Sequence, residues 1–145
     1  MQEEAGLILK LYELRREDTM RKARDWFWMF NPQSLEDFNN TMLGDKEQSG
    51  YMRMVYSYWD MAAALVNHGA ISMEFFNDTN AEHIGVFSKF EPILGEIRAV
   101  AGPGFLASLE KLIDATPDGR KRSAAMREAM KPIIARFAAA KAAQT

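Results

Sequence analysis

Hydrophobic residues recur every three to four positions along most of the chain, which is the spacing of one face of an α-helix. From residue 2 to residue 30 this spacing is continuous, so we predict a long N-terminal helix or two helices in series. Asp18-Thr19 is the candidate boundary between them, since an aspartate there can cap a second helix. Asn31-Pro32 ends the segment, because the residue before a proline disfavours the helical conformation.

The middle of the chain carries broad hydrophobic stripes at the same spacing. Ser34 predicts the start of a short helix that reaches about Leu43. A longer helix is expected over about residues 48–68, and Gly69 is a typical residue for its C-terminal end. A short helical turn over residues 73–77 completes this part of the chain.

Three further helical segments are predicted after residue 79. Asn80 is expected to cap a helix that reaches Ala101, with Pro92 kinking or dividing it. Another helix is expected over residues 105–115, and a last one over about residues 120–143. Because no segment alternates hydrophobic and polar residues between hairpin turns, we predict an all-α single-domain bundle of about five to seven helices.

Length and composition narrow the class of protein. A chain of 145 residues is the size of one domain, and the absence of cysteine excludes disulfides and thiolate metal sites. The longest hydrophobic runs are far shorter than the roughly 18 residues of a membrane span, and Met1 opens no signal peptide. We therefore expect a soluble, cytoplasmic protein without a membrane span.

Charge divides the chain into two parts. Residues 119–145 hold seven basic residues and one acidic residue, so of the total net charge of −2 they carry +6 and residues 1–118 carry −8. We predict that this basic C-terminal helix packs on the acidic body through one hydrophobic stripe, although a basic amphipathic helix can also bind an anionic surface. Nucleic acid is not an expected partner, because the body is acidic. The stripe consists of Met126, Met130, Ile133, Ile134 and Phe137.

Residues 60–83 contain a cluster of histidine and carboxylate side chains, which are types that bind divalent metals. Glu82 and His83 are adjacent and therefore point about 100° apart on a helix, whereas helical metal sites place their ligands three or four residues apart. We predict neither a metal nor a cofactor. The full cluster is Asp60, His68, Asp78, Glu82 and His83.

Aromatic residues give the candidate binding site. The run from Trp26 to Phe30 is hydrophobic on every side of its helix, which indicates core packing, a dimer interface or a small apolar pocket. Asp60, which lies among aromatic and methionine residues, is expected to be buried and paired with an arginine; Arg21, Arg24 and Arg53 are the candidates. The candidate ligand-binding residues are Trp26, Trp28, Trp59, Asp60 and Phe87.

Three stretches, residues 11–16 (LYELRR), 21–27 (RKARDWF) and 58–71 (YWDMAAALVNHGAI), carry a resemblance to known proteins. Over about residues 7–98 the chain resembles an uncharacterised family of small bacterial all-helical proteins. The resemblance implies an all-helical fold and supplies no catalytic residue.

These observations support three functional hypotheses. The first is a non-enzymatic interaction or scaffolding module that self-associates as a homodimer or larger oligomer and can bind a protein partner. The second is a helical protein that binds a small apolar or aromatic ligand near Trp26, Trp59 and Phe87. The third, an enzyme that uses Asp60 or His83, has the least support, because neither residue belongs to a recognisable catalytic pattern.

Overall fold

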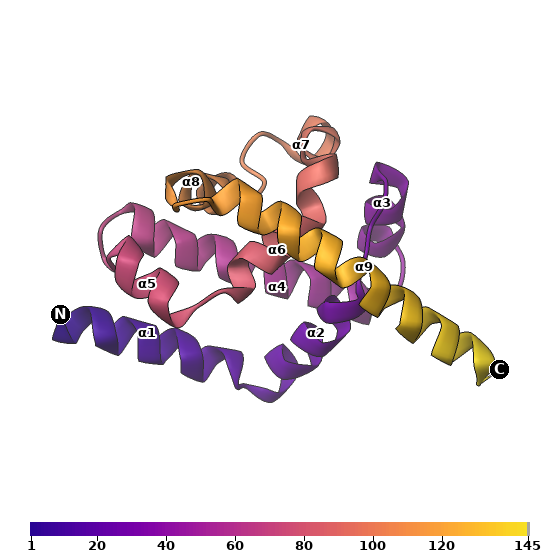
Figure 1. The fold of residues 1–145 in the computed structure, drawn as a ribbon, viewed down its shortest axis with the longest axis horizontal. Helices are drawn as coiled ribbons and strands as arrows, with labels where there is room; N and C mark the ends of the chain where they lie inside the picture. Colours follow the sequence, from indigo (N-terminus) through magenta and orange to yellow (C-terminus); the bar gives the residue numbers. More distant parts are fainter. Residues whose placement is uncertain (145) are drawn as a thin grey trace.

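The computed structural model describes residues 1–144, and over these residues the fold is all-helical (Figure 1). Helices are more numerous than the five to seven predicted, because caps and a 3-10 turn divide two of the expected segments. The elements are α1 (Gln2–Arg15), α2 (Asp18–Met29), α3 (Leu35–Leu43), α4 (Lys46–Asn67), α5 (Met73–Thr79), α6 (Glu82–Phe90), η1 (Glu91–Ile93), α7 (Leu94–Ala101), α8 (Ala107–Ala115) and α9 (Gly119–Ala143).

The N-terminal segment forms two helices in series, so of the two arrangements predicted the single long helix is wrong. Glu17 adopts an extended conformation between α1 and α2, and its side chain accepts a hydrogen bond from the backbone N–H of Met20. This interaction caps α2 and also lowers the pKa of the Glu17 carboxyl. The cap is one residue before the Asp18 boundary that the sequence indicates.

Local signals in the sequence set most of the other boundaries. The Ser34 hydroxyl accepts a hydrogen bond from the backbone N–H of Asp37 at the start of α3. Gly69 follows α4 with a φ of +84°, a conformation that glycine adopts without strain. Pro92 lies in η1, which separates α6 from α7. Asn80 is an exception, because it does not cap α6. Its side-chain amide donates a hydrogen bond to the backbone oxygen of Phe76 and accepts one from Arg15.

The core is centred on α4, which packs against α2, α3, α6 and α8. One stripe of α4 is buried, including Met52, Val55 and the fully enclosed Trp59. Side chains of α6 complete the core from the other side. The largest fully buried side chains are Trp59, Phe76, Phe87, Phe90, Met52, Ile71, Ile84, Ile97, Leu106, Leu109, Leu112 and Ile113.

The first half of α9 packs on α6 and α8, as predicted for the basic helix. Gly119 is required at its start, because a Cβ there would lie 2.0 Å from the backbone oxygen of Ile113. Arg120 then forms ion pairs with Glu91 (3.0 Å), Glu110 (2.8 Å) and Asp114 (2.6 Å). These contacts join the basic helix to three carboxylates of the acidic body.

The second half of α9 differs from the prediction. Ile133 is 37% exposed and Phe137 is 56% exposed, so the hydrophobic stripe is not covered along its full length. The reason is geometric: a helix of 25 residues is about 37 Å long, whereas the neighbouring α6 has nine residues and a length of about 13 Å. Figure 1 shows the C-terminal end of α9 extending past the other helices.

Candidate functional site

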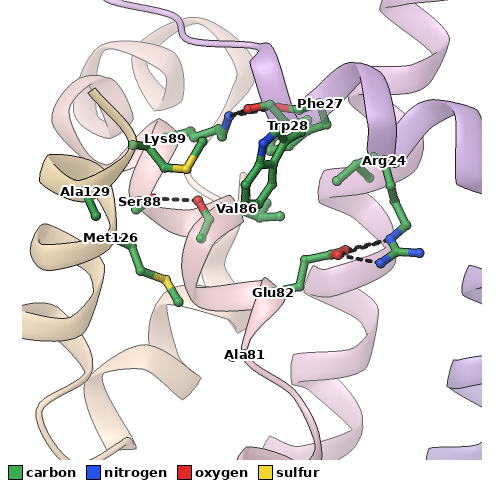
Figure 2. Close-up of a pocket in the computed structure, with 13 residues that line it drawn as sticks. Arg24, Phe27, Trp28, Ala81, Glu82, Val86, Ser88, Lys89, Met126 and Ala129 are labelled. Atoms are coloured by element: carbon green, nitrogen blue, oxygen red, sulfur yellow. Dashed lines mark hydrogen bonds and ion pairs between the residues drawn. The ribbon is translucent and has the colours of Figure 1, made fainter. Parts of the chain in front are cut away.

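An apolar pocket of about 280 Å³ lies between α2, α6 and α9. Figure 2 shows the Trp28 side chain beside Val86 of α6, with Met126 and Ala129 of α9 across the pocket. Gly85 of α6 also lines it, and the absence of a side chain there leaves room between α6 and α9. The pocket is therefore formed by three segments that are far apart in the sequence.

Among the predicted aromatic site residues, Trp28 is the one that lines this pocket. It is 54% exposed and lies in the last turn of α2. Trp26 lies elsewhere on the same helix: it stacks on Phe30, with 4.9 Å between ring centroids, and contacts Tyr51. The two neighbouring tryptophans thus have separate roles, since α2 turns them to different sides.

Trp59 and Phe87 are core residues with no exposed surface. The indole Nε1 of Trp59 donates a hydrogen bond to Glu82 (2.9 Å), and this carboxylate lines the pocket. The ring of Phe87 lies below the guanidinium of Arg120, 5.0 Å from its centroid. Neither aromatic residue lines the pocket, and Trp59 is connected to it through Glu82.

Asp60 does not pair with an arginine. Its Oδ1 accepts a hydrogen bond from the backbone N–H of Leu109 at 2.8 Å. Leu109 lies in the first turn of α8, where backbone N–H groups have no partner within the helix, so Asp60 caps α8 from another helix. The expected buried ion pair is therefore wrong: Asp60 is half-buried, and its partner is a backbone amide.

An ion pair between Arg24 and Glu82 closes one end of the pocket (Figure 2). Arg24 donates from Nε and Nη2 to the carboxylate at 2.7 to 3.1 Å, and Trp59 donates to the same carboxylate. The hydrogen bond to Glu82 raises the pKa of the Arg24 guanidinium. In the sequence Arg24 is one of three candidate partners for Asp60, because a partner 58 residues away in the chain leaves no local pattern.

Lys89 lies at the other end of the pocket and was not predicted as a site residue. Its Nζ donates to the backbone oxygens of Phe27 (2.8 Å), Trp28 (2.7 Å) and Phe30 (2.7 Å), which end α2. Burial lowers the pKa of the Lys89 amine to about 8. The one available signal was a lysine placed between two aromatic residues, Phe87 and Phe90, on a hydrophobic helix.

Two further cavities continue the pocket along α9. One, of about 370 Å³, lies between α9 and the loop at Asn31–Gln33, and the other, of about 480 Å³, lies between Met29 and the outer part of α9. Ile134 lines both cavities and Phe137 lines the second. The three cavities follow one another along α9, and together we call them the α2–α9 groove. Its α9 wall carries Met126, Met130, Ile134 and Phe137, with Arg127 and Lys131 at the middle cavity.

The histidine and carboxylate residues of the polar cluster around residues 60–83 are dispersed or already paired. Glu82 binds Arg24, while His83 is fully buried between Phe76 and Trp59. Among residues 1–144, no group of three or more histidine, aspartate or glutamate side chains could hold a metal ion. Burial is the main reason that the pKa of His83 falls to about 4, and the charge of Arg122 lowers it further.

The fold and the site define an all-helical protein with an apolar groove beside its C-terminal helix. The chain belongs to the family described as a domain of unknown function, DUF4760, whose sequence profile matches residues 1–116. This match confirms the resemblance found in the sequence and extends it to the end of α8. No curated protein and no solved structure matches the chain. Within the described residues, no helix is both long and apolar enough to cross a membrane.

Proposed function

We propose that the protein is a non-enzymatic interaction module that self-associates through the outer half of α9, residues 130–143. The observation that carries this proposal is the row of uncovered hydrophobic side chains along the α2–α9 groove. Trp28 and Phe137, which line the groove, are 54% and 56% exposed, and Ile133, next to Ile134 in α9, is 37% exposed. Tryptophan, phenylalanine and methionine are enriched at the centres of protein interfaces, and all three line this groove.

A second copy of the chain is the partner that the charges favour. Residues 130–143 hold three basic residues and no acidic residue, whereas residues 1–118 have a net charge of −8. At long range the outer half of one α9 is therefore attracted to the acidic body of another copy. Within the groove the charged side chains are basic except for the paired Glu82, so the contact there is hydrophobic. In a two-fold symmetric dimer each copy would place its outer α9 in the groove of the other, so both grooves would be covered at once.

Covering these side chains supplies a substantial driving force. Burying the exposed half of one large aromatic side chain removes roughly 100 Å² from water, which contributes about 2 to 3 kcal/mol. Phe137 and Trp28 each offer such a half in every copy. With two such side chains in each copy, a dimer gains four aromatic contacts. Together they offset part of the rotational and translational entropy that is lost on association.

The enzymatic alternative has less support from the geometry. Asp60 is engaged with the first turn of α8, and the His83 ring has no exposed surface through which a substrate could reach it. A catalytic acid or base must come within hydrogen-bond distance of the reacting atoms. The groove, by contrast, is open to another macromolecule.

Light scattering coupled to size exclusion tests the proposal at roughly 5 and 100 μM protein. We expect the mass to rise toward that of a dimer with concentration, and to fall again at roughly 0.5 M salt because the charges are screened. Phe137→Glu should shift the protein toward the monomer. Leu43→Glu is the matched control, since Leu43 is a hydrophobic residue that is 83% exposed on α3, away from the groove.

Two results would contradict the proposal. One is a wild-type protein that stays monomeric at the higher concentration. The other is a dimer that responds equally to Phe137→Glu and Leu43→Glu, which would place the interface elsewhere. Both variants should keep the wild-type circular dichroism spectrum, because both side chains are mostly exposed.

A further inference from the structure

The pocket beside Trp28 is a distinct part of the α2–α9 groove, because it lies against the packed half of α9 instead of the outer half. We infer that this pocket binds a small, uncharged aromatic molecule of about two fused rings. The residues that define the pocket floor, Gly85 and Val86, belong to α6, so the pocket is complete in a single copy of the chain.

The size of the pocket sets the size of the ligand. An apolar cavity of about 150 Å³ in another protein holds one benzene molecule. The present pocket, at about 280 Å³, has close to twice that volume. A bicyclic hydrocarbon therefore fits, whereas a single ring would leave a part of the pocket empty.

The hydrogen bonds around the pocket favour an uncharged ligand. Arg24 and Glu82 bind each other, and Glu82 also accepts from Trp59. Ser88 donates its hydroxyl hydrogen to the backbone oxygen of Gly85 (2.6 Å), while Lys89 donates to three backbone oxygens. A charged ligand would have to break these bonds or enter without a partner, and either costs free energy. A hydrocarbon meets no such penalty.

The shape of the pocket favours aromatic rings. Figure 2 shows the flat indole of Trp28 along one side of the pocket and the Met126 side chain approaching from α9. Aromatic rings stack on indoles with an offset, and methionine sulfur packs favourably against ring edges. Met130 adds a second flexible side chain to the same wall, so the pocket can close around a flat molecule.

Glycine 85 provides a direct way to block the pocket. A Cβ at this position would lie 3.8 Å from the Met126 sulfur, which is an ordinary contact, so the backbone tolerates a side chain there. Gly85→Leu would place that side chain in the space available to the ligand. Gly95→Leu is the matched control, since Gly95 is also within a helix, is exposed, and lies outside the pocket.

Isothermal titration with naphthalene, and with 2-naphthoate as its anionic counterpart, tests the inference. We expect saturable binding of naphthalene to the wild-type protein, at least tenfold weaker binding to Gly85→Leu, and unchanged binding to Gly95→Leu. Gly85→Ala should bind with an intermediate affinity, and it serves in place of Gly85→Leu if the larger side chain lowers the melting temperature. 2-Naphthoate should bind at least tenfold more weakly than naphthalene.

Three outcomes would overturn the inference. The wild-type protein could show no saturable binding up to the solubility of naphthalene. The Gly85 variants could bind naphthalene as well as Gly95→Leu does, which would place the site elsewhere. Equal or tighter binding of 2-naphthoate would show that Arg24 or Lys89 recognises an anion, so that the ligand belongs to another class. The titrations are run at a protein concentration at which the protein is monomeric, because a second copy seated in the groove would cover Trp28.

Discussion

His83 makes the folded protein sensitive to mild acid. The ring is fully buried, with its centroid 4.9 Å from that of Phe76 and 5.8 Å from that of Trp59. Within residues 1–144 neither ring nitrogen has a hydrogen-bond partner. Burial therefore penalises the protonated ring, and the pKa of His83 falls from 6.5 to about 4.

The sign and size of the effect follow from proton linkage. Between pH 6.5 and pH 4 the unfolded chain binds a proton at His83 and the folded protein does not, so acid favours unfolding. The stability that depends on a neutral His83 is fully present above pH 6.5 and is lost as the pH falls toward 4. Because the pKa of His83 falls from 6.5 to about 4, the free energy of unfolding is lower by about 3 kcal/mol at pH 4, and by about 2 kcal/mol at pH 5, than at neutral pH.

Urea denaturation at pH 7.5 and pH 5.0 measures this loss. His83→Leu has a similar volume and no titratable group, so its stability should change by less than about 0.5 kcal/mol between the two values of pH, against about 2 kcal/mol for the wild type. The ion-paired carboxylates lose their contribution mainly below pH 4.5, so pH 5.0 isolates the histidine. An equal loss in both proteins would refute the reasoning.

Two further substitutions test the structural interactions. Arg120→Met should lower the free energy of unfolding by about 1 to 3 kcal/mol, because three carboxylates lose their shared partner. The control is Lys131→Met, which removes an exposed ion pair and should leave the urea midpoint unchanged. Equal effects of the two substitutions would contradict the anchoring of α9 by Arg120. Asp60→Ala should lower the free energy of unfolding by about 1 to 2 kcal/mol in the same assay. Asp60→Asn should lower it by less, because an amide oxygen can still accept the hydrogen bond from the Leu109 N–H. A larger loss for Asp60→Asn than for Asp60→Ala would contradict the capping role.

The sequence was sufficient wherever a structural feature depends on neighbouring residues. Ser34 caps α3, Gly69 ends α4 with a positive φ, and Pro92 divides α6 from α7. Each feature needs a residue type and the conformation of the next few residues, and both can be inferred from the local sequence. The all-helical class follows from the same kind of pattern.

Long-range contacts account for what the sequence could not predict. The Arg24 side chain reaches Glu82, 58 residues away, and Lys89 reaches the end of α2 across a similar separation. Asp60 meets Leu109 across 49 residues. Hydrophobic spacing shows which face of a helix is buried but not which helix covers it, so the pocket between α2, α6 and α9 had no signature in the sequence.

The length of α9 explains the other difference. The sequence predicts a core stripe along the whole length of α9, yet the body covers it only as far as about Met130. A periodic pattern indicates that one side of a helix is hydrophobic. It does not indicate whether the surface that covers this side belongs to the same chain or to a second one.

Photo-crosslinking between copies tests the proposed association most directly. The chain would carry p-benzoylphenylalanine in place of Phe137, and it would be mixed with isotopically heavy wild-type protein before irradiation. Association through the α2–α9 groove predicts cross-links from position 137 of one copy to residues near Trp28 or Met29 of the heavy copy. Cross-links confined to peptides of the same light chain, or joined to heavy peptides outside the α2–α9 groove, would contradict it.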